Sequence, residues 1–174
     1  MTNARILLFA VILNIALTSC QDPVTPPQNA VKLTVAELKN TVGYEWFNAY
    51  WTLYKPDTII TQEITAAFDT NVHKFVIFIE PSCSCRELVR EPADLAKVLE
   101  IAMVNQEFYD IYSMGGVTSK HPFEDKLTIT KLPQVHLLKS GEFVYSILDT
   151  FNYYSARDKS TKIESIILDA LKNN

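Results

Sequence analysis

Glycine, cysteine and basic residues are all scarce in this chain of 174 residues, which has four glycines and three cysteines. So few glycines exclude a collagen-like chain, and a hydrophobic content of 48% excludes a largely disordered one. Three cysteines are too few for a scaffold held together by disulfides. Sixteen basic residues stand against twenty acidic ones and form no basic patch, so we expect no nucleic-acid partner. The remaining composition is that of a globular protein of about one domain.

The hydrophobic run near the N-terminus, from Ile6 to Leu17, is short and follows a single charged residue, Arg5. Its twelve residues rise by ~1.5 Å each and cannot cross a hydrocarbon core of ~30 Å, so the run is typical of a signal peptide. The run ends in Leu17-Thr18-Ser19-Cys20, which resembles a bacterial lipobox, whose cysteine is lipidated and becomes the mature N-terminus. We therefore predict a signal peptide over residues 1–19 and a lipid-anchored, extracytoplasmic protein of the bacterial cell envelope. The alternative for Cys20 is a buried cysteine in an ordinary helix.

A tether and the start of a folded domain follow the signal peptide. Three prolines among residues 20–32 predict a semi-extended, lipid-anchored tether, so that the folded domain spans residues 33–174. Thr34, followed three residues later by Glu37, is typical of a capping box at the start of a helix. The aromatic residues that follow suit either packing of this helix on the domain or a ligand surface. Apolar side chains recur at every fourth position and predict one helix that runs to about Trp51: Leu38, Val42, Trp46 and Tyr50.

The rest of the chain alternates between strand and helix patterns. A β-branched run over 58–61 predicts a short strand, and a small helix is expected over 64–68. Residues 74–80 form a nearly continuous apolar run, which is typical of a central strand buried on both faces. A helix is expected from about 84 to 102, bent or restarted at Pro92. The remaining expected elements are a strand over 107–114, an irregular or partly helical segment over 115–131, strands over 134–138 and 143–148 joined by a hairpin, and a helix over 159–171.

Two motifs accompany this order of elements. Cys83 and Cys85 stand where the central strand gives way to a helix, and Cys83 comes five residues after Phe78. Leu132-Pro133 directly precedes a strand and its hairpin. Together with the order of elements, these motifs resemble the thioredoxin superfamily over roughly residues 58–171.

The resemblance implies an α/β, thioredoxin-like three-layer fold, in which a central mixed β-sheet is flanked by helices, here with an extra N-terminal helix. It also implies that the Leu132–Pro133 peptide bond is cis. One departure is that a single residue separates the cysteines where thioredoxins have two, and another is Ile77 at the position of the family's buried aspartate. Because that aspartate assists proton transfer, either Glu80 substitutes for it or the chemistry is slower. A solvated strand end is the alternative for Glu80.

The chemistry of two neighbouring cysteines depends on the thiolate, which is the attacking species. A cysteine at a helix N-terminus beside cations has a lowered pKa, so we predict that Cys83 is the nucleophile and that Arg86 supports its thiolate. Cys85 is then the resolving thiol that releases a mixed disulfide. The pair would exchange disulfides with protein thiol or disulfide clients and with an electron-transfer partner in the envelope, without any cofactor.

The same cysteine pair leaves two alternatives to redox chemistry: metal handling and binding without catalysis. Two soft thiolates close in sequence suit Cu(I), or Zn with further ligands, of which His121 is a better candidate than the strand residue His136. A thioredoxin-fold lipoprotein that binds a partner without catalysis is the other alternative. Thioredoxins have a tryptophan directly before the first cysteine, where this chain has Ser82. The loss of this tryptophan, of the aspartate and of the two-residue spacing favours the non-catalytic alternative, whereas a cysteine pair at the family's active-site position argues against it.

Overall fold

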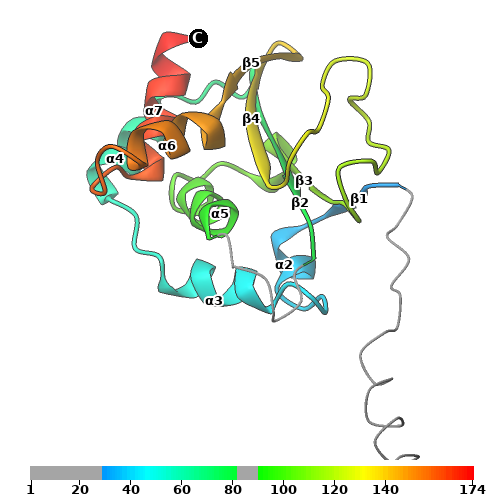
Figure 1. Ribbon diagram of the computed structural model, residues 1–174. Helices are drawn as coiled ribbons and strands as arrows, with labels where there is room; N and C mark the ends of the chain where they lie inside the picture. The colour runs from blue at the N-terminus through cyan, green and yellow to red at the C-terminus, as the bar shows by residue number, and fades with distance from the viewer. Residues whose placement is uncertain (1–28, 82–89) are drawn as a thin grey trace, which may run out of the picture.

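The computed structural model describes residues 29–81 and 90–174, which are arranged as Figure 1 shows. Within these residues the chain has an α/β fold, in which a five-stranded mixed sheet packs against helices. The strands lie in the order β1-β3-β2-β4-β5, with β2 and β3 parallel and the other neighbouring pairs antiparallel. The strands are β1 (Val31–Leu33), β2 (His73–Ile79), β3 (Tyr109–Ser113), β4 (Gln134–Lys139) and β5 (Glu142–Ser146). The helices are α2 (Val35–Leu38), α3 (Glu45–Leu53), α4 (Thr58–Ala67), α5 (Glu91–Ile101), α6 (Ile147–Ser155) and α7 (Ile163–Asn173), with a 3₁₀ turn η1 (Gln106–Phe108).

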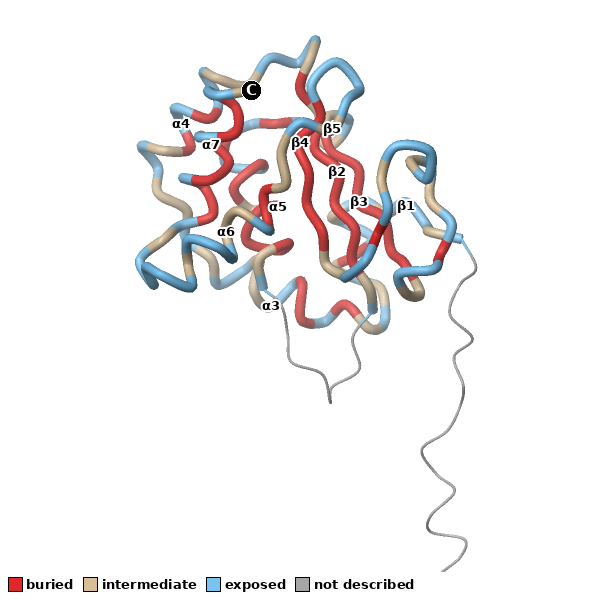
Figure 2. The backbone as a smooth tube through the Cα atoms, turned by 45° about the horizontal axis from the view of Figure 1, so that its top comes forward, coloured by how far each residue is buried: buried red, intermediate tan, exposed pale blue. Residues whose placement is uncertain are grey.

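The central strand β2 is buried on both faces, as its continuous apolar run predicted (Figure 2). Phe75 and Ile77 belong to the larger core, which the sheet shares with the helices. Val76 and Phe78 point the other way, because successive side chains of a strand alternate between its faces. They join a second, smaller core with residues from the segment between β3 and β4.

This second face carries no helical layer in the part of the chain that the structure describes, so the three-layer expectation is corrected there. The covering segment, residues 115–131, contains turns and bends, as predicted. Its side chains Phe123, Leu127 and Ile129 nevertheless pack on the sheet and complete the smaller core. Pro122, in the middle of the segment, disfavours a continuous helix because proline lacks the backbone N–H that a helix interior needs.

The strand predicted over 58–61 is wrong, since these residues form the first turn of α4. The carboxylate of Asp57 accepts hydrogen bonds from the backbone N–H groups of Ile59 at 3.0 Å and of Ile60 at 3.4 Å. Aspartate at this position caps a helix by satisfying N–H groups that have no partner within the helix. The cap therefore outweighs the preference of the β-branched residues for a strand.

The sheet instead gains an edge strand from the range expected as a tether. β1 pairs with β3, with Val31 opposite Ser113, and Asn29 forms a bridge to Lys120 just before it. The folded domain therefore begins before residue 33, because these backbone groups find hydrogen-bond partners in the sheet. Residues 20–28 of the expected tether, and the expected signal peptide, lie outside the described residues.

The helix predicted from Thr34 to Trp51 is interrupted. Its start is confirmed, since Thr34 and Glu37 form the expected capping box. The chain then turns at Gly43, whose φ of +89° is a left-handed conformation that favours glycine. Val42 is consequently 88% exposed and takes no part in the apolar face predicted for it. The part of the predicted helix that follows Gly43 forms α3, which buries Trp46.

The last part of the chain follows the prediction except for one additional helix. α5 begins at Glu91 with Pro92 in its first turn, where proline's missing N–H costs nothing. The expected strand over 143–148 ends at Ser146, and α6 begins at the next residue. The closing helix is confirmed as α7, which buries the predicted apolar face: Ile163, Ile166, Ile167 and Leu171.

Candidate functional site

The candidate site lies at the carboxyl end of β2, where the chain leaves the sheet at Glu80 and Pro81. β2 and β3 run parallel and end together, with Ile79 opposite Ser113. In α/β proteins the loops at the carboxyl ends of parallel strands are where ligands bind most often. Of the predicted site residues, Cys83, Cys85 and Arg86 follow this strand end and lie outside the described residues, as does Cys20.

The strand pairing brings three of the predicted residues together. β4 runs antiparallel to β2 with Gln134 opposite Phe78, so the preceding residues, Leu132 and Pro133, lie beside the end of β2. The pairing ends there, and Leu132 and Pro133 form a bend directly before β4. The Leu132–Pro133 peptide bond is cis, which confirms that prediction. Glu80 is half-buried.

A buried tyrosine at this end of the sheet escaped the sequence analysis. The hydroxyl of Tyr44, a residue only 1% exposed, donates a hydrogen bond to Ser113 Oγ at 2.6 Å. Burial raises the pKa of Tyr44 to about 12, the contact with Ser113 opposes the rise, and the negative charge of Glu80 adds to it. Tyr44 therefore stays protonated at neutral pH and ties the start of α3 to the end of β3. Only the density of aromatic residues hinted at this role, because the two partners are far apart in the sequence.

Gly43 lies directly against the start of the cysteine segment. A Cβ atom added to Gly43 would lie 3.0 Å from Cβ of Pro81, which is tighter than nine in ten real Cβ contacts. The left-handed backbone of Gly43 and the close approach of Pro81 both require the absence of a side chain. Gly43 thus fixes how Pro81 leaves the sheet, immediately before the cysteines.

We expect Gly43→Ala to lower the free energy of unfolding by about 2 kcal/mol or more, because it combines backbone strain with overlap against Pro81. Gly141→Ala is the matched control, since Gly141 also has a positive φ but its added Cβ would meet nothing within 4 Å. That variant is expected to lose about 1 kcal/mol. Urea unfolding of both variants measures the difference. Equal losses would contradict a tight contact between Gly43 and Pro81.

The two histidines weighed as metal ligands have different surroundings. The ring of His136 is buried, and its Nε2 lies 3.0 Å from Oε1 of Gln134. The ring of His121 lies 5.1 Å from that of Phe78, and burial lowers its pKa while Glu124 opposes the shift. Among residues 29–81 and 90–174, histidine, cysteine, aspartate and glutamate side chains form no group of three or more suited to a metal ion.

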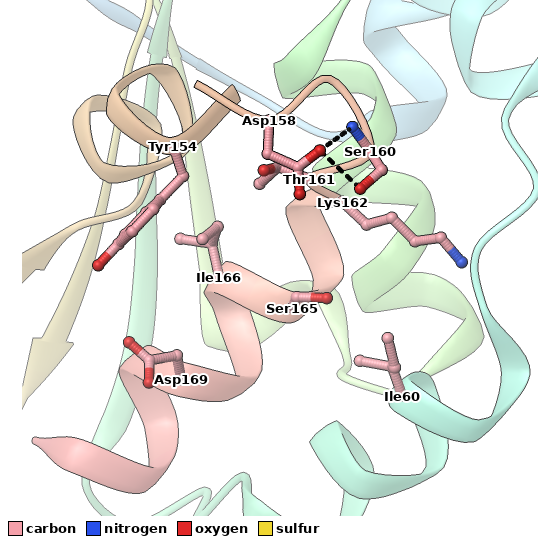
Figure 3. Close-up of a pocket in the computed structure, with 9 residues that line it drawn as sticks. All are labelled: Ile60, Tyr154, Asp158, Ser160, Thr161, Lys162, Ser165, Ile166 and Asp169. Atoms are coloured by element: carbon pink, nitrogen blue, oxygen red, sulfur yellow. Dashed lines mark hydrogen bonds between the residues drawn. The ribbon is translucent and has the colours of Figure 1, made fainter. Parts of the chain in front are cut away.

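A groove of about 560 Å³ lies between α4, α7 and the chain that connects α6 to α7 (Figure 3). Asp158 accepts hydrogen bonds from the backbone N–H of Ser160 at 2.9 Å and from its hydroxyl at 2.7 Å, which fixes the turn at one end of the groove. The nine lining residues include no histidine or cysteine, so the groove does not offer the predicted thiol chemistry. They are Ile60, Tyr154, Asp158, Ser160, Thr161, Lys162, Ser165, Ile166 and Asp169.

No helix within the described ranges, 29–81 and 90–174, is both long and apolar enough to span a bilayer. The chain matches no protein-family model, no curated protein and no solved structure.

Proposed function

We propose that this protein is a lipid-anchored thiol–disulfide oxidoreductase of the bacterial cell envelope, with Cys83 and Cys85 as its redox pair. Its clients are proteins with exposed thiols or disulfides, and a further thiol protein of the envelope exchanges electrons with it. The fold proposed for this activity is thioredoxin-like.

The observation that carries the proposal is the position of Pro133 beside the end of β2. Gln134 pairs with Phe78, so Pro133, the residue before Gln134, lies near the end of β2, and Cys83 follows that strand end four residues later. The thioredoxin resemblance requires such a proline loop beside the cysteines, although the two motifs are some fifty residues apart in the sequence. The proline loop therefore lies near the end of the strand that leads to the cysteines, as the family pattern requires.

The arrangement of the later elements adds support for the thioredoxin-like fold. A parallel unit formed by β2, α5 and β3 is followed by the antiparallel hairpin β4–β5 and the closing helix α7. The cysteines stand between β2 and α5 in the sequence, which is the family's position for them. The irregular cover on the second face of the sheet and the single residue between the cysteines are departures from the family pattern.

The proposed reaction moves two electrons between the cysteine pair and a client disulfide. The thiolate of Cys83 attacks one client sulfur, which breaks the client S–S bond, forms a mixed disulfide and releases one client thiolate. The thiolate of Cys85 then attacks Cys83 in the mixed disulfide, which releases the second client thiolate and leaves an intramolecular disulfide. The client is reduced and the cysteine pair oxidised, and the reverse sequence oxidises a client. Glu80 is proposed to accept the proton that Cys85 loses.

The test is the equilibrium of the purified full-length protein with glutathione redox buffers. A disulfide across one intervening residue closes a smaller ring than the family's usual pair, and strained, exposed disulfides are more oxidising. We therefore expect a potential clearly above the roughly −270 mV of a reducing thioredoxin. We also expect turnover of a disulfide-containing peptide.

The alternatives predict different results in the same preparation. A non-catalytic binding protein would show no turnover of either a dithiol or a disulfide substrate. A metal-handling protein would bind Cu(I) stoichiometrically and lose it in both the Cys83→Ser and the Cys85→Ser variants. Either result would replace the proposed oxidoreductase.

Lipidation is tested separately from the redox chemistry. Cys20→Ser is expected to abolish labelling with a radioactive fatty acid and to release the protein from the membrane fraction, because two or more acyl chains give stable anchoring. Cys83→Ser is the control and should remain labelled and membrane-bound. Unchanged membrane association of Cys20→Ser would refute the lipid anchor and leave the proposed redox activity to be judged by its own test.

A further inference from the structure

The groove of Figure 3 lies on the helices α4 and α7, away from the end of β2, and polar side chains dominate its lining. Its volume of about 560 Å³ falls within the usual range of about 300–1,000 Å³ for sites that bind small molecules. Tyr154 lies at one side of the groove, Ile60 at the other, and Ile166 of α7 between them. Six of the nine lining residues carry a hydroxyl or a carboxylate group: Tyr154, Asp158, Ser160, Thr161, Ser165 and Asp169.

Several of these polar groups are free to bind a ligand. Asp158 is exposed and uses only its Oδ1 to accept the two hydrogen bonds from Ser160. Within residues 29–81 and 90–174, its Oδ2 and the hydroxyls of Thr161 and Ser165 have no hydrogen-bond partner. A hydroxyl both donates and accepts, whereas a carboxylate oxygen only accepts. This mixture suits a ligand that itself carries several hydroxyl groups.

The charges of the lining favour a neutral ligand. Asp158 and Asp169 supply two carboxylates, and hydrogen bonds from Ser160 hold the pKa of Asp158 below its ordinary value. The one basic residue of the lining, Lys162, is already paired, because its Nζ lies 3.0 Å from Asp57 Oδ2 outside the groove. The groove therefore repels an anion such as a phosphate. A cation would meet only exposed carboxylates, whose ion pairs contribute little in water.

Tyr154 supplies an aromatic surface beside these polar groups. It is 49% exposed, and the ring centre of Tyr153 lies 5.2 Å from its own at a right angle, which helps to hold the ring in place. The face of an aromatic ring carries partial negative charge and attracts C–H groups. An exposed aromatic ring next to free hydroxyl and carboxylate groups suits a molecule with an apolar face and a polar rim.

We propose that this groove binds a neutral saccharide of flat, β-linked rings, with one ring stacked on Tyr154. The sugar hydroxyls bond to Asp158 Oδ2 and to the hydroxyls of Thr161 and Ser165. In a β-linked glucose unit the hydroxyls point outward around the ring, and the axial C–H groups cover its two faces. The site uses neither cysteine of the proposed redox pair and stands independently of the proposed function.

Calorimetric titration of the full-length protein with cellobiose, at neutral pH, tests the site. We expect saturable binding at one site. Sorbitol offers the same kind of hydroxyl groups without a flat ring and should bind far more weakly, because it cannot stack. Excess inorganic phosphate should leave cellobiose binding unchanged, since the groove repels anions.

Two pairs of variants separate stacking from hydrogen bonding. Tyr154→Ala should weaken cellobiose binding about tenfold or more, whereas Tyr154→Phe keeps the ring and should stay within about threefold of the wild type. Asp158→Asn keeps an oxygen for Ser160 but removes the charged acceptor, and should weaken binding about threefold or more. Asp125→Asn, the same change at an exposed position between β3 and β4, should bind like the wild type.

Tyr154 and Asp158 are both exposed, so these substitutions leave the hydrophobic core intact. Absence of saturable binding, equal binding of sorbitol, or competition by phosphate would each overturn the proposal. Equal affinity of wild type and Tyr154→Ala would overturn it as well, because the sugar would then bind elsewhere.

Discussion

Cys83→Ser is expected to abolish reaction with a disulfide substrate, whereas Cys85→Ser should trap covalent complexes with clients. The difference follows from the proposed order of attack, in which Cys83 forms the mixed disulfide and Cys85 releases it. Without Cys85 the first step still proceeds, and nothing within the protein resolves its product. Non-reducing gels of membrane extracts, followed by mass spectrometry of the high-mass bands, would detect the trapped clients.

The assignment of the two roles rests on the sequence position of Cys83 after β2 and before α5. The neighbouring Arg86 favours a thiolate, so we expect the pKa of Cys83 to lie below ~8.5. Thiolate absorbance during a pH titration of Cys85→Ser measures it. The double variant Cys83→Ser/Cys85→Ser is the control and should show neither thiolate signal nor trapped clients. A Cys83 pKa at or above the free-cysteine value, together with no turnover, would favour the non-catalytic alternative.

The elements that could be predicted from the sequence are those whose signals are local. β2 could be predicted because five apolar residues in a row, Phe75 to Ile79, leave few alternatives to a buried strand. The start of α2 could be predicted because Thr34 and Glu37 satisfy each other's neighbouring backbone groups within one turn. The closing helix α7 could be predicted because its apolar face repeats with the helical period.

The errors arose where a single residue or a distant partner decides the structure. Asp57 caps α4 and turns a β-branched run into a helix, although the run alone favours a strand. α2 ends at Leu38 and the chain turns at Gly43, in spite of the continuing four-residue spacing of apolar side chains. β1 has too few residues to show a pattern, and its hydrogen bonds come from β3, which lies about eighty residues further along the chain.

The candidate site likewise contains one residue that could be predicted from the sequence and one contact that could not. Pro133 could be predicted because a resemblance pointed to it, and it directly precedes Gln134, which pairs with Phe78 of β2. The contact of Tyr44 with Ser113 could not, because a hydrogen bond between residues in different elements leaves no mark on either local sequence.

Replacement of Glu164 by alanine is expected to lower the free energy of unfolding more than replacement of Gly43 or Gly141. Glu164 is 1% exposed, and its carboxylate accepts hydrogen bonds from the Tyr54 hydroxyl and, at 3.0 Å, from the backbone N–H of Asp57. These contacts join the first turn of α7 to the end of α3 and to the residue that caps α4. Burial raises the pKa of Tyr54 far above its ordinary value, with the charge of Glu164 adding to the rise, so the tyrosine remains a donor.

Glu164→Ala should therefore lower the free energy of unfolding by about 3 kcal/mol, because it leaves two half-buried donors without an acceptor. Tyr54→Phe removes one of the two bonds and should cost about 1.5–3 kcal/mol, since the lost bond is to a charged group. Tyr145→Phe is the matched control, because its hydroxyl bonds Asp169 at the surface and its loss should cost under about 0.5 kcal/mol.

A double-mutant cycle separates the contact from the general effect of each substitution. Glu164→Gln keeps an oxygen for one donor while removing the charge, and its combination with Tyr54→Phe should destabilise the protein by clearly less than the sum of the single losses. The expected coupling is about 1 kcal/mol or more, because both changes disrupt the same buried bond. Additive losses in urea unfolding, or a Glu164→Ala variant as stable as Tyr145→Phe, would show that this connection between α3, α4 and α7 does not hold the helices together.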